Sequence, residues 1–304
     1  MPTHIALAGA TGNLGQPILK HLLDKNFTVT VLSRINGTSS KLTPHPNLTI
    51  KQVDFTSVQS LTAALKDPTP PQVLISCLAT LAIGSQNPLI DAAVTAGVQR
   101  FIPAEFGMDS TNPLARALPV CAPKAVTQEY LAEKAGSNAG FSWTGIANGL
   151  FLDWCLDAGI ILDFRTRCAT LYNGGDVKFS ATLLSDVARA VVGVIGHLVE
   201  TKNRVVYVQS ATVTQNQLLG YAKERDGKDW HVTVKGTEEV RQESLEKLAK
   251  GEQVDIDGAM LGFCIVGSWD PEYGCDFSRH LDNELLGVRE LTEAELSGVV
   301  GGYM

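Results

Sequence analysis

Several features that mark particular classes of protein are scarce in this sequence of 304 residues. No apolar run approaches the ~20 residues that a membrane-spanning helix needs, and the first expected strand starts at His4, which leaves no room for a secretion signal. Positive charge is also scarce: the formal net charge is -7, which argues against nucleic acid as a partner. We therefore expect a soluble cytoplasmic protein that acts neither at a membrane nor on nucleic acid.

Motifs for metal binding and for nucleophilic catalysis are absent as well. The six cysteines are dispersed, with no C-x-x-C pair and no metal-ligand spacing, and the histidines show no H-E-x-x-H pattern. We therefore expect no metal site, and reduced cysteines that mostly belong to the core. No G-x-S-x-G motif occurs, so a Ser-His-Asp hydrolase has no support. The cysteines are Cys77, Cys121, Cys155, Cys168, Cys264 and Cys275.

A glycine-rich turn near the N-terminus gives the first positive signal. The stretch that starts at His4 reads HIALAGATGNLG, so an apolar run is followed by a G-x-x-G-x-x-G pattern. A strand, three glycines and a helix in this order are typical of a dinucleotide site, although a tight β-α turn without a ligand is the alternative. Gly9 can make the turn that leaves the strand, Gly12 lacks the Cβ that would keep a pyrophosphate from the backbone, and Gly15 lets the helix lie close to the strand.

The residues after the second expected strand distinguish NAD from NADP. An NAD site of this type usually carries an acidic residue about 20 residues beyond the glycines, where it holds the ribose hydroxyls. Between Thr28 and Asn47 the sequence has no carboxylate, but it has Ser33, Arg34 and, a little further on, Lys41. Because a guanidinium can grip a 2′-phosphate, we predict NADP rather than NAD. The alternative for the arginine is a solvated position on a polar loop.

Strands and helices alternate through the first half of the chain. Successive β-α units of this kind predict a Rossmann-type, doubly wound parallel sheet, which we assign to an NADP-binding domain at 1–155. Apolar, β-branched runs predict the strands 28–33, 48–53, 73–77, 99–102 and 141–147. The predicted helices are 14–25, one that follows 54–57 and ends at 65, 87–96, and one within 119–134.

The second half mixes strands and helices without a glycine turn of its own. We predict a smaller α+β, mainly substrate-binding region at 156–304, with some segments that return to the Rossmann sheet. Local signals predict a hairpin within 168–177, a helix capped by Asp186, and a capping box of Thr292 and Glu295. Four aromatic residues are candidates for a pocket wall or for plain core: Trp154, Tyr172, Phe263 and Trp269.

The glycine turn is one of several motifs that occur together. It is followed by R-F-I-P-A-E-F-G at 100–107, then by Lys124, and then by Asn148 and Phe151. In this combination the chain resembles the NmrA-like and isoflavone-reductase-like branch of the atypical short-chain dehydrogenases. The segment 100–107 is the specific part, because the glycine turn alone is shared by many unrelated enzymes.

The resemblance implies an NADPH-dependent reductase of an aromatic, secondary-metabolite-like small molecule. In such enzymes the matching lysine is the general acid/base and also contacts the nicotinamide ribose, so that this role falls on Lys124. The segment 103–106 would line the nicotinamide side, and Asn148 and Phe151 the floor of the pocket. One departure is Ala104, because reductases of this family usually have serine there.

The chemistry of hydride transfer agrees with this assignment. Transfer from a nicotinamide needs a group that protonates or polarises the acceptor, and Lys124 is the candidate, with a surface lysine at a helix start as the alternative. The tyrosine of an ordinary Tyr-x-x-x-Lys pair is replaced by Val120. Glu105 is either a catalytic residue of the site or a buried anchor of its loop. Asp54 either lies by the adenine or caps a helix, a role for which Ser57 is an equal candidate. The candidate cofactor-binding residues are Gly9, Thr11, Gly12, Asn13, Leu14, Gly15, Ser33, Arg34, Lys41, Asp54, Cys77, Leu78, Pro103, Glu105, Phe106, Lys124, Asn148 and Phe151.

Two further functions stay open on the sequence alone. A dinucleotide-sensing regulator, of the kind found among NmrA-like proteins, would bind the cofactor without turnover and control a partner protein, although a pure sensor need not keep Lys124. An isomerase or cyclase would keep NADP in a structural role and use the same lysine for acid/base chemistry. Whether the protein is a monomer or a homodimer is equally open.

Overall fold

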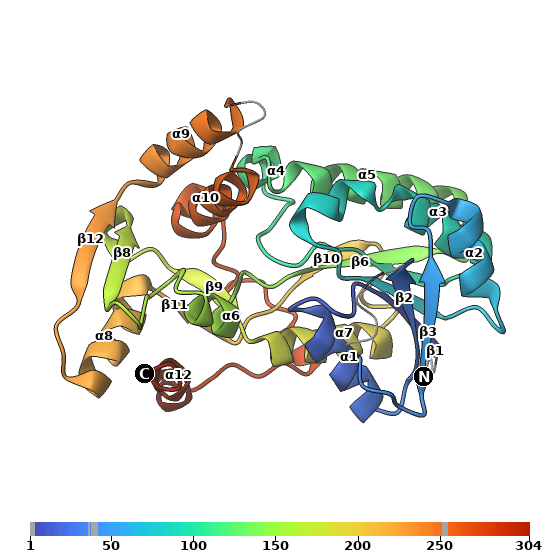
Figure 1. The fold of residues 1–304 in the computed structure, drawn as a ribbon, viewed down its shortest axis with the longest axis horizontal. Coiled ribbons are helices and arrows are strands. Elements are labelled where there is room, and N and C mark those ends of the chain that lie inside the picture. The colour runs from blue at the N-terminus through green and yellow to red at the C-terminus, as the bar shows by residue number, and fades with distance from the viewer. Residues whose placement is uncertain (1–3, 36, 38–41, 251–254) are drawn as a thin grey trace.

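A seven-stranded parallel sheet forms the centre of the larger part of the molecule (Figure 1). The computed structural model describes residues 4–35, 37, 42–250 and 255–304. Within them the strand order is β10-β6-β5-β4-β1-β2-β3, and every neighbouring pair is parallel, which confirms the Rossmann-type sheet. The strands are β1 (His4–Ala8), β2 (Thr28–Arg34), β3 (Leu48–Val53), β4 (Val73–Ser76), β5 (Arg100–Ile102), β6 (Ser142–Ala147) and β10 (Arg204–Tyr207).

Helices cover both faces of this sheet, as a doubly wound fold requires. Side chains alternate along a strand, so Ile5 and Leu7 of β1 face one core with α1 and α7, while Ala6 and Ala8 face another with α2, α3 and α5. None of the described helices combines the length and the apolarity needed to cross a membrane. These helices are α1 (Gly15–Asp24), α2 (Val58–Lys66), α3 (Asn87–Ala96), α5 (Ala122–Ser137) and α7 (Leu184–Gly196).

A separate core lies beside the sheet and belongs mostly to the second half of the chain. It joins the sheets β11-β9-β7 and β12-β8 to several helices, and Figure 1 shows β8, β12 and α9 at the end of the molecule opposite α2 and β3. β10 nevertheless lies in the large sheet, paired with β6. The elements of the second half are α6 (Leu152–Asp157), β7 (Leu150–Phe151), β8 (Cys168–Tyr172), β9 (Phe179–Thr182), β11 (Ala211–Val213), α8 (Gln215–Asp226), β12 (His231–Lys235), α9 (Thr237–Leu248), α10 (Ile256–Trp269), α11 (Asn283–Leu286) and α12 (Glu293–Gly301).

The hairpin predicted within 168–177 is wrong. β8 pairs in parallel with β12, and β9, the next strand, joins a different sheet. The residues of η3 (Asn173–Gly175) do turn the chain, with φ values of 48°, 85° and 84°. However, the Asn173 amide donates to Thr237 Oγ1 at 2.8 Å and to the Trp269 carbonyl at 3.1 Å, so the turn is fixed to α9 and α10.

The cap predicted for α7 is also wrong. Asp186 lies inside the first turn of the helix and accepts a hydrogen bond from Ser210 Oγ at 2.6 Å. The carboxylate that accepts from the first amide of the helix, that of Leu184 at 3.1 Å, belongs to Asp153. A cap supplied from 31 residues away leaves no local signal in the sequence. The capping box predicted at the start of α12 is confirmed.

Candidate functional site

The residues predicted to bind the cofactor follow the carboxyl ends of neighbouring strands. Positions 9–15 follow β1, 33–34 end β2, 54 follows β3, 77–78 follow β4, and 103–106 follow β5. Because the strands are parallel and adjacent, these positions meet at one edge of the sheet. Open α/β sheets bind their ligands at this edge, where the strand order reverses.

Two of the three glycines are required by the fold itself. Gly9 has a φ of 83°, and a Cβ on it would lie 2.3 Å from the carbonyl oxygen of Cys77 after β4. A Cβ on Gly15 would lie 2.1 Å from the carbonyl oxygen of Gly9. The tight turn and the close approach of helix to strand are therefore both present.

Gly12 differs from its neighbours because packing does not explain it. A Cβ on this exposed residue would meet, among the described atoms, only the carbonyl oxygen of Gly9 at 3.5 Å, an ordinary contact. The space that a Cβ would fill lies at the turn that leads into the N-terminus of α1, where the helix dipole favours an anion. The turn thus fits a pyrophosphate.

Arg34 is the last residue of β2 and is exposed at the carboxyl edge of the sheet, and Ser33 beside it is half-buried. β2 lies next to β1, so the arginine stands one strand away from the glycine turn. This is where a dinucleotide on that turn would place its adenosine ribose. Lys41, predicted for the same site, lies outside the described residues.

Asp54 follows β3 and holds its own turn. Its carboxylate accepts hydrogen bonds from the N–H of Thr56 at 2.9 Å and from the hydroxyl of Thr56 at 2.7 Å, which lower the pKa of Asp54. The cap of α2 is Ser57, whose hydroxyl accepts from the N–H of Ser60 at 3.1 Å. The capping role considered for this segment therefore belongs to the serine.

Lys124 is buried near the start of α5 with only 6 % of its surface exposed. Its Nζ donates hydrogen bonds to the backbone carbonyls of Glu105 and, at 2.8 Å, of Phe106. An ammonium has three N–H groups. One therefore remains once the partners in the described part of the chain are counted, and the lysine is not the solvated surface residue of the alternative interpretation.

The loop after β5, whose carbonyls bind Lys124, is itself fixed by hydrogen bonds. The N–H of Gly107 donates to Asn148 Oδ1 at 3.0 Å, and its carbonyl accepts from the N–H groups of Asn148 and Gly149. The N–H of Ala104 donates to Gln86 Oε1 at 3.0 Å. Asn148, expected at the floor of the pocket, is fully buried and uses its side-chain oxygen to fix the loop.

Glu105 has the geometry of a buried anchor. Its side chain is 1 % exposed, and its carboxylate accepts a hydrogen bond from Ser110 Oγ. Ser110 in turn accepts from Gln128 Nε2 at 2.6 Å, and Gln128 lies on α5 one turn after the lysine. The other candidates near this loop, Pro103 excepted, are half-buried: Cys77, Leu78, Phe106 and Phe151.

Four of the six cysteines lie in surroundings that do not support thiol chemistry. Burial raises the pKa of four thiols to about 12, so they stay protonated near neutral pH. Within the described ranges, no group of three or more His, Cys, Asp or Glu side chains is placed to hold a metal ion. The four thiols are those of Cys77, Cys121, Cys155 and Cys275.

Three of the four aromatic candidates belong to the core. Phe263 and Trp269 are each 1 % exposed, and the Tyr172 ring stacks on Trp269 with centroids 5.0 Å apart. Trp154 is 37 % exposed and borders a hollow of about 550 Å³ that also adjoins the glycine turn. The lining of that hollow is Asn13, Gln16, Pro17, Lys20, Trp154 and Leu184.

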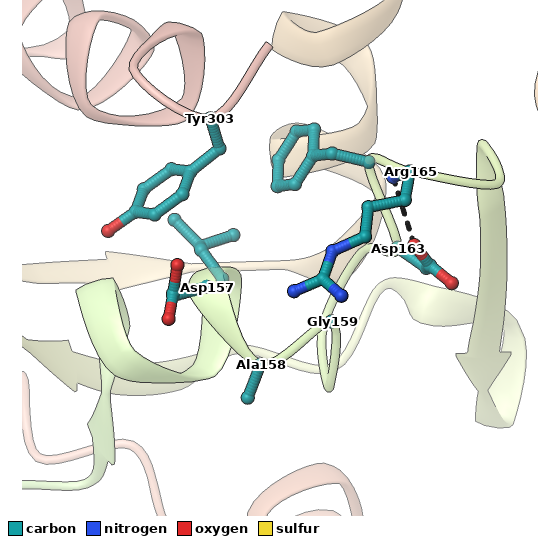
Figure 2. A pocket seen from close by; sticks show the side chains of 8 residues that line it. Asp157, Ala158, Gly159, Asp163, Arg165 and Tyr303 are labelled. Atoms are coloured by element: carbon teal, nitrogen blue, oxygen red, sulfur yellow. Dashed lines mark hydrogen bonds between the residues drawn. The ribbon is translucent and has the colours of Figure 1, made fainter.

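A smaller hollow of about 210 Å³ lies between α6, the chain that follows it and the C-terminal Tyr303. Figure 2 shows Asp157, Arg165 and Tyr303 around it. Its lining contains none of the residues predicted for the cofactor or for catalysis. The carboxyl edge of the sheet therefore remains the candidate active site.

Comparison with known proteins agrees with the motifs and with the sheet. The NmrA-like family model matches residues 1–254. Oxidoreductase aprR of Aspergillus flavus is 34% identical over 307 residues, which cover 99% of this chain and 100% of that protein. Oxidoreductase poxI of Penicillium oxalicum is 31% identical over 97% of this chain and 93% of its own length.

Solved structures share the whole fold. AtPrR2 with NADP+ and (+)pinoresinol superposes with a TM-score of 0.76 at 20% identity, over 100% of this chain and 99% of that one. The leucoanthocyanidin reductase–NADPH complex from Vitis vinifera has a TM-score of 0.76 at 18% identity, over 99% of each chain. The family match over 254 residues and the relatives of full length show that this chain belongs to the NmrA-like family.

Proposed function

We propose that this protein is an NADPH-dependent reductase of an aromatic small molecule of the secondary-metabolite kind. The observation that carries the proposal is the position of Lys124, buried beside the ligand-binding edge of the sheet, where the described residues take up two of its three N–H groups. The names of the two fungal relatives, both oxidoreductases, support it. So do the cofactors in the similar structures, NADP+ in one and NADPH in the other.

The residues present fit NADPH. The space over Gly12, at the N-terminal end of α1, would hold the pyrophosphate, and Arg34 would hold the 2′-phosphate. The segment 103–106 would lie on the nicotinamide side, next to Lys124. NADPH supplies a hydride when it is bound.

The role of the lysine follows from its hydrogen bonds. Two carbonyl oxygens fix the direction of the Lys124 ammonium, so that its third N–H can point at the substrate atom on which negative charge develops. As the substrate receives the hydride, the ammonium transfers one proton to that atom. The substrate gains a hydride and a proton and is reduced by two electrons, and the amine then recovers its proton from water.

Calorimetric titration with NADPH, NADP+ and NADH in parallel tests the cofactor half of the proposal. NADPH should bind at least as tightly as NADP+ and far more tightly than NADH. If NADP+ binds clearly more tightly than NADPH, a sensor or a non-redox enzyme replaces the reductase. If no dinucleotide binds, the glycine pattern is only a turn.

Turnover tests the catalytic half of the proposal, the reduction of an aromatic acceptor. The near-ultraviolet absorbance of NADPH should fall when the protein is mixed with NADPH and an aromatic acceptor, with pinoresinol and a naphthoquinone as the first probes. Product formation at constant NADPH absorbance would instead identify an isomerase or cyclase that keeps the dinucleotide in a structural role.

A further inference from the structure

We propose that Ser110 and Gln128 are positioning residues for Lys124, which they control through the buried side chain of Glu105. The proposal rests on the proposed function, in which the lysine delivers the proton. It gives a role to the hydrogen-bonded side chains of Glu105, Ser110 and Gln128, which do not themselves transfer the proton.

The helix α5 holds the loop after β5 at two points. Lys124 and Gln128 are four residues apart, so their side chains leave the same face of the helix one above the other. The lysine bonds the backbone carbonyls of Glu105 and Phe106, and the glutamine bonds Ser110 at 2.6 Å. The backbone and the side chain of one glutamate are thus tied to a single helix.

The direction of the hydrogen bonds in this group is fixed. A serine hydroxyl has one proton, and that of Ser110 is donated to the Glu105 carboxylate. The hydroxyl oxygen accepts from the amide of Gln128, which has protons to give. The amide nitrogen of Gln128 can only donate, so the single proton of Ser110 is left for the carboxylate of Glu105 and the order amide, hydroxyl, carboxylate cannot reverse.

The three polar side chains of this arrangement are buried, so each depends on its protein partners for hydrogen bonds. The side chains of Ser110, Glu105 and Gln128 are 0 %, 1 % and 8 % exposed. A carboxylate that loses its donor in such surroundings cannot replace it with bulk water, so the side chain has to move toward other partners. Because the carbonyl of the same residue accepts from the lysine, a shift of Glu105 also changes the direction of the ammonium.

The expected consequence is confined to the lysine. The pyrophosphate turn follows β1 and Arg34 ends β2, away from the loop after β5, so a change at Ser110 should leave the contacts to the pyrophosphate and the 2′-phosphate unaffected. A proton donor that is misdirected by a small amount loses much of its effect, and we expect about a tenfold loss of kcat. The same shift of Glu105 loosens the hydrogen bonds of the Lys124 ammonium, which should raise the chemical reactivity of the amine.

Competitive acetylation tests this without a substrate. The protein is exposed to a trace of acetic anhydride at a series of pH values, and peptide mass spectrometry gives the rate at the Lys124 amine. In Ser110→Ala the lysine should react about tenfold faster and with a shifted pH profile, and Ser110→Thr, which keeps the hydroxyl, should restore the wild-type profile.

Thr127→Val is the matched control. Thr127 is a buried hydroxyl residue on the same helix, 3 % exposed, and its hydroxyl donates to the carbonyl of Pro123. A merely structural effect would lower the melting temperature in both variants and leave the labelling of Lys124 unchanged in both. If Ser110→Ala does not fold, Gln128→Met is the second variant: it removes the bond that holds the serine hydroxyl on the carboxylate of Glu105, so labelling of Lys124 should change in the same direction.

Labelling identical to wild type in the folded variant would overturn the proposal. Its failure is separate from that of the reductase. If Ser110→Ala alters the labelling while the wild type reduces no acceptor, positioning stands and the reductase fails. If Lys124→Ala loses turnover while Ser110→Ala keeps both wild-type labelling and wild-type kcat, only positioning fails.

Discussion

The Nζ of Lys124 lies 2.8 Å from the carbonyl oxygen of Phe106 and hydrogen bonds to it. This bond joins the start of α5 to the loop after β5, 18 residues earlier in the chain. The lysine and the R-F-I-P-A-E-F-G segment, which the sequence presents as separate motifs, are therefore parts of one structural unit. Substitutions in that unit and in the dinucleotide site beside it can test the two separately.

Alanine at two neighbouring glycines should separate folding from binding. Gly12→Ala should leave the melting temperature close to that of the wild type, because its Cβ meets only an ordinary contact of 3.5 Å. The same methyl group occupies the space expected for the pyrophosphate, so calorimetry should show NADPH binding weakened by about tenfold or more.

Gly9→Ala is the contrasting variant. Its φ of 83° alone costs an alanine about 1–2 kcal/mol, and its Cβ would lie 2.3 Å from the Cys77 carbonyl oxygen. Urea denaturation should show a marked loss of stability. If Gly12→Ala binds NADPH as tightly as the wild type does, the pyrophosphate does not lie over the turn.

Arg34→Ala should abolish the preference for NADPH over NADH. Hydrogen bonds to a charged group contribute about 1.5–3 kcal/mol, so the variant should bind NADPH roughly 10- to 100-fold more weakly and NADH as before. Parallel titrations with the two cofactors measure the ratio. Arg165→Ala, an exposed arginine in the smaller hollow of Figure 2, is the control and should change neither affinity. An unchanged ratio in Arg34→Ala would remove the 2′-phosphate assignment.

The buried thiols should make the fold sensitive to alkali. Burial raises the pKa of Cys155 from 9.0 to about 12, so the folded protein holds this proton more tightly than the unfolded chain does. The resulting stability is fully present below pH 9.0 and is lost as the pH rises toward 12. Cys155→Ala should therefore show a flatter decline in the free energy of unfolding over this range. Urea titrations at several pH values measure both slopes, and equal slopes would contradict the burial of the thiol.

Local signals made the first half of the chain predictable. The strand Leu48–Val53 and the helix Asn87–Ala96 coincide with the predicted ranges, because apolar periodicity, a proline in the first turn and a glycine at the end act over a few residues. The glycine turn was predictable for the same reason. Its three glycines lie within seven residues at a fixed spacing, which is visible in the sequence itself.

Long-range pairing made the rest unpredictable. Thr170 of β8 lies opposite Thr233 of β12, 63 residues later, and no local pattern selects that partner over a hairpin. The side chain of Gln86 accepts a hydrogen bond from the N–H of Ala104, 18 residues later. A single polar side chain of this kind belongs to no sequence pattern, so its partner cannot be predicted. No pattern in the sequence indicates the bond from Ser110 for the same reason, although the sequence does predict a buried anchor as one of two roles for Glu105.

Turnover by Lys124→Ala tests the central claim most directly. The measurement is the rate of NADPH oxidation with an acceptor that the wild type reduces, together with NADPH affinity by calorimetry. Lys134→Ala is the matched control, since Lys134 lies on the same helix and pairs at 2.7 Å with Asp91 away from the loop after β5. We predict that Lys124→Ala binds NADPH and loses about 10²–10⁴-fold in kcat, while Lys134→Ala keeps its activity. Wild-type turnover in Lys124→Ala would contradict the account.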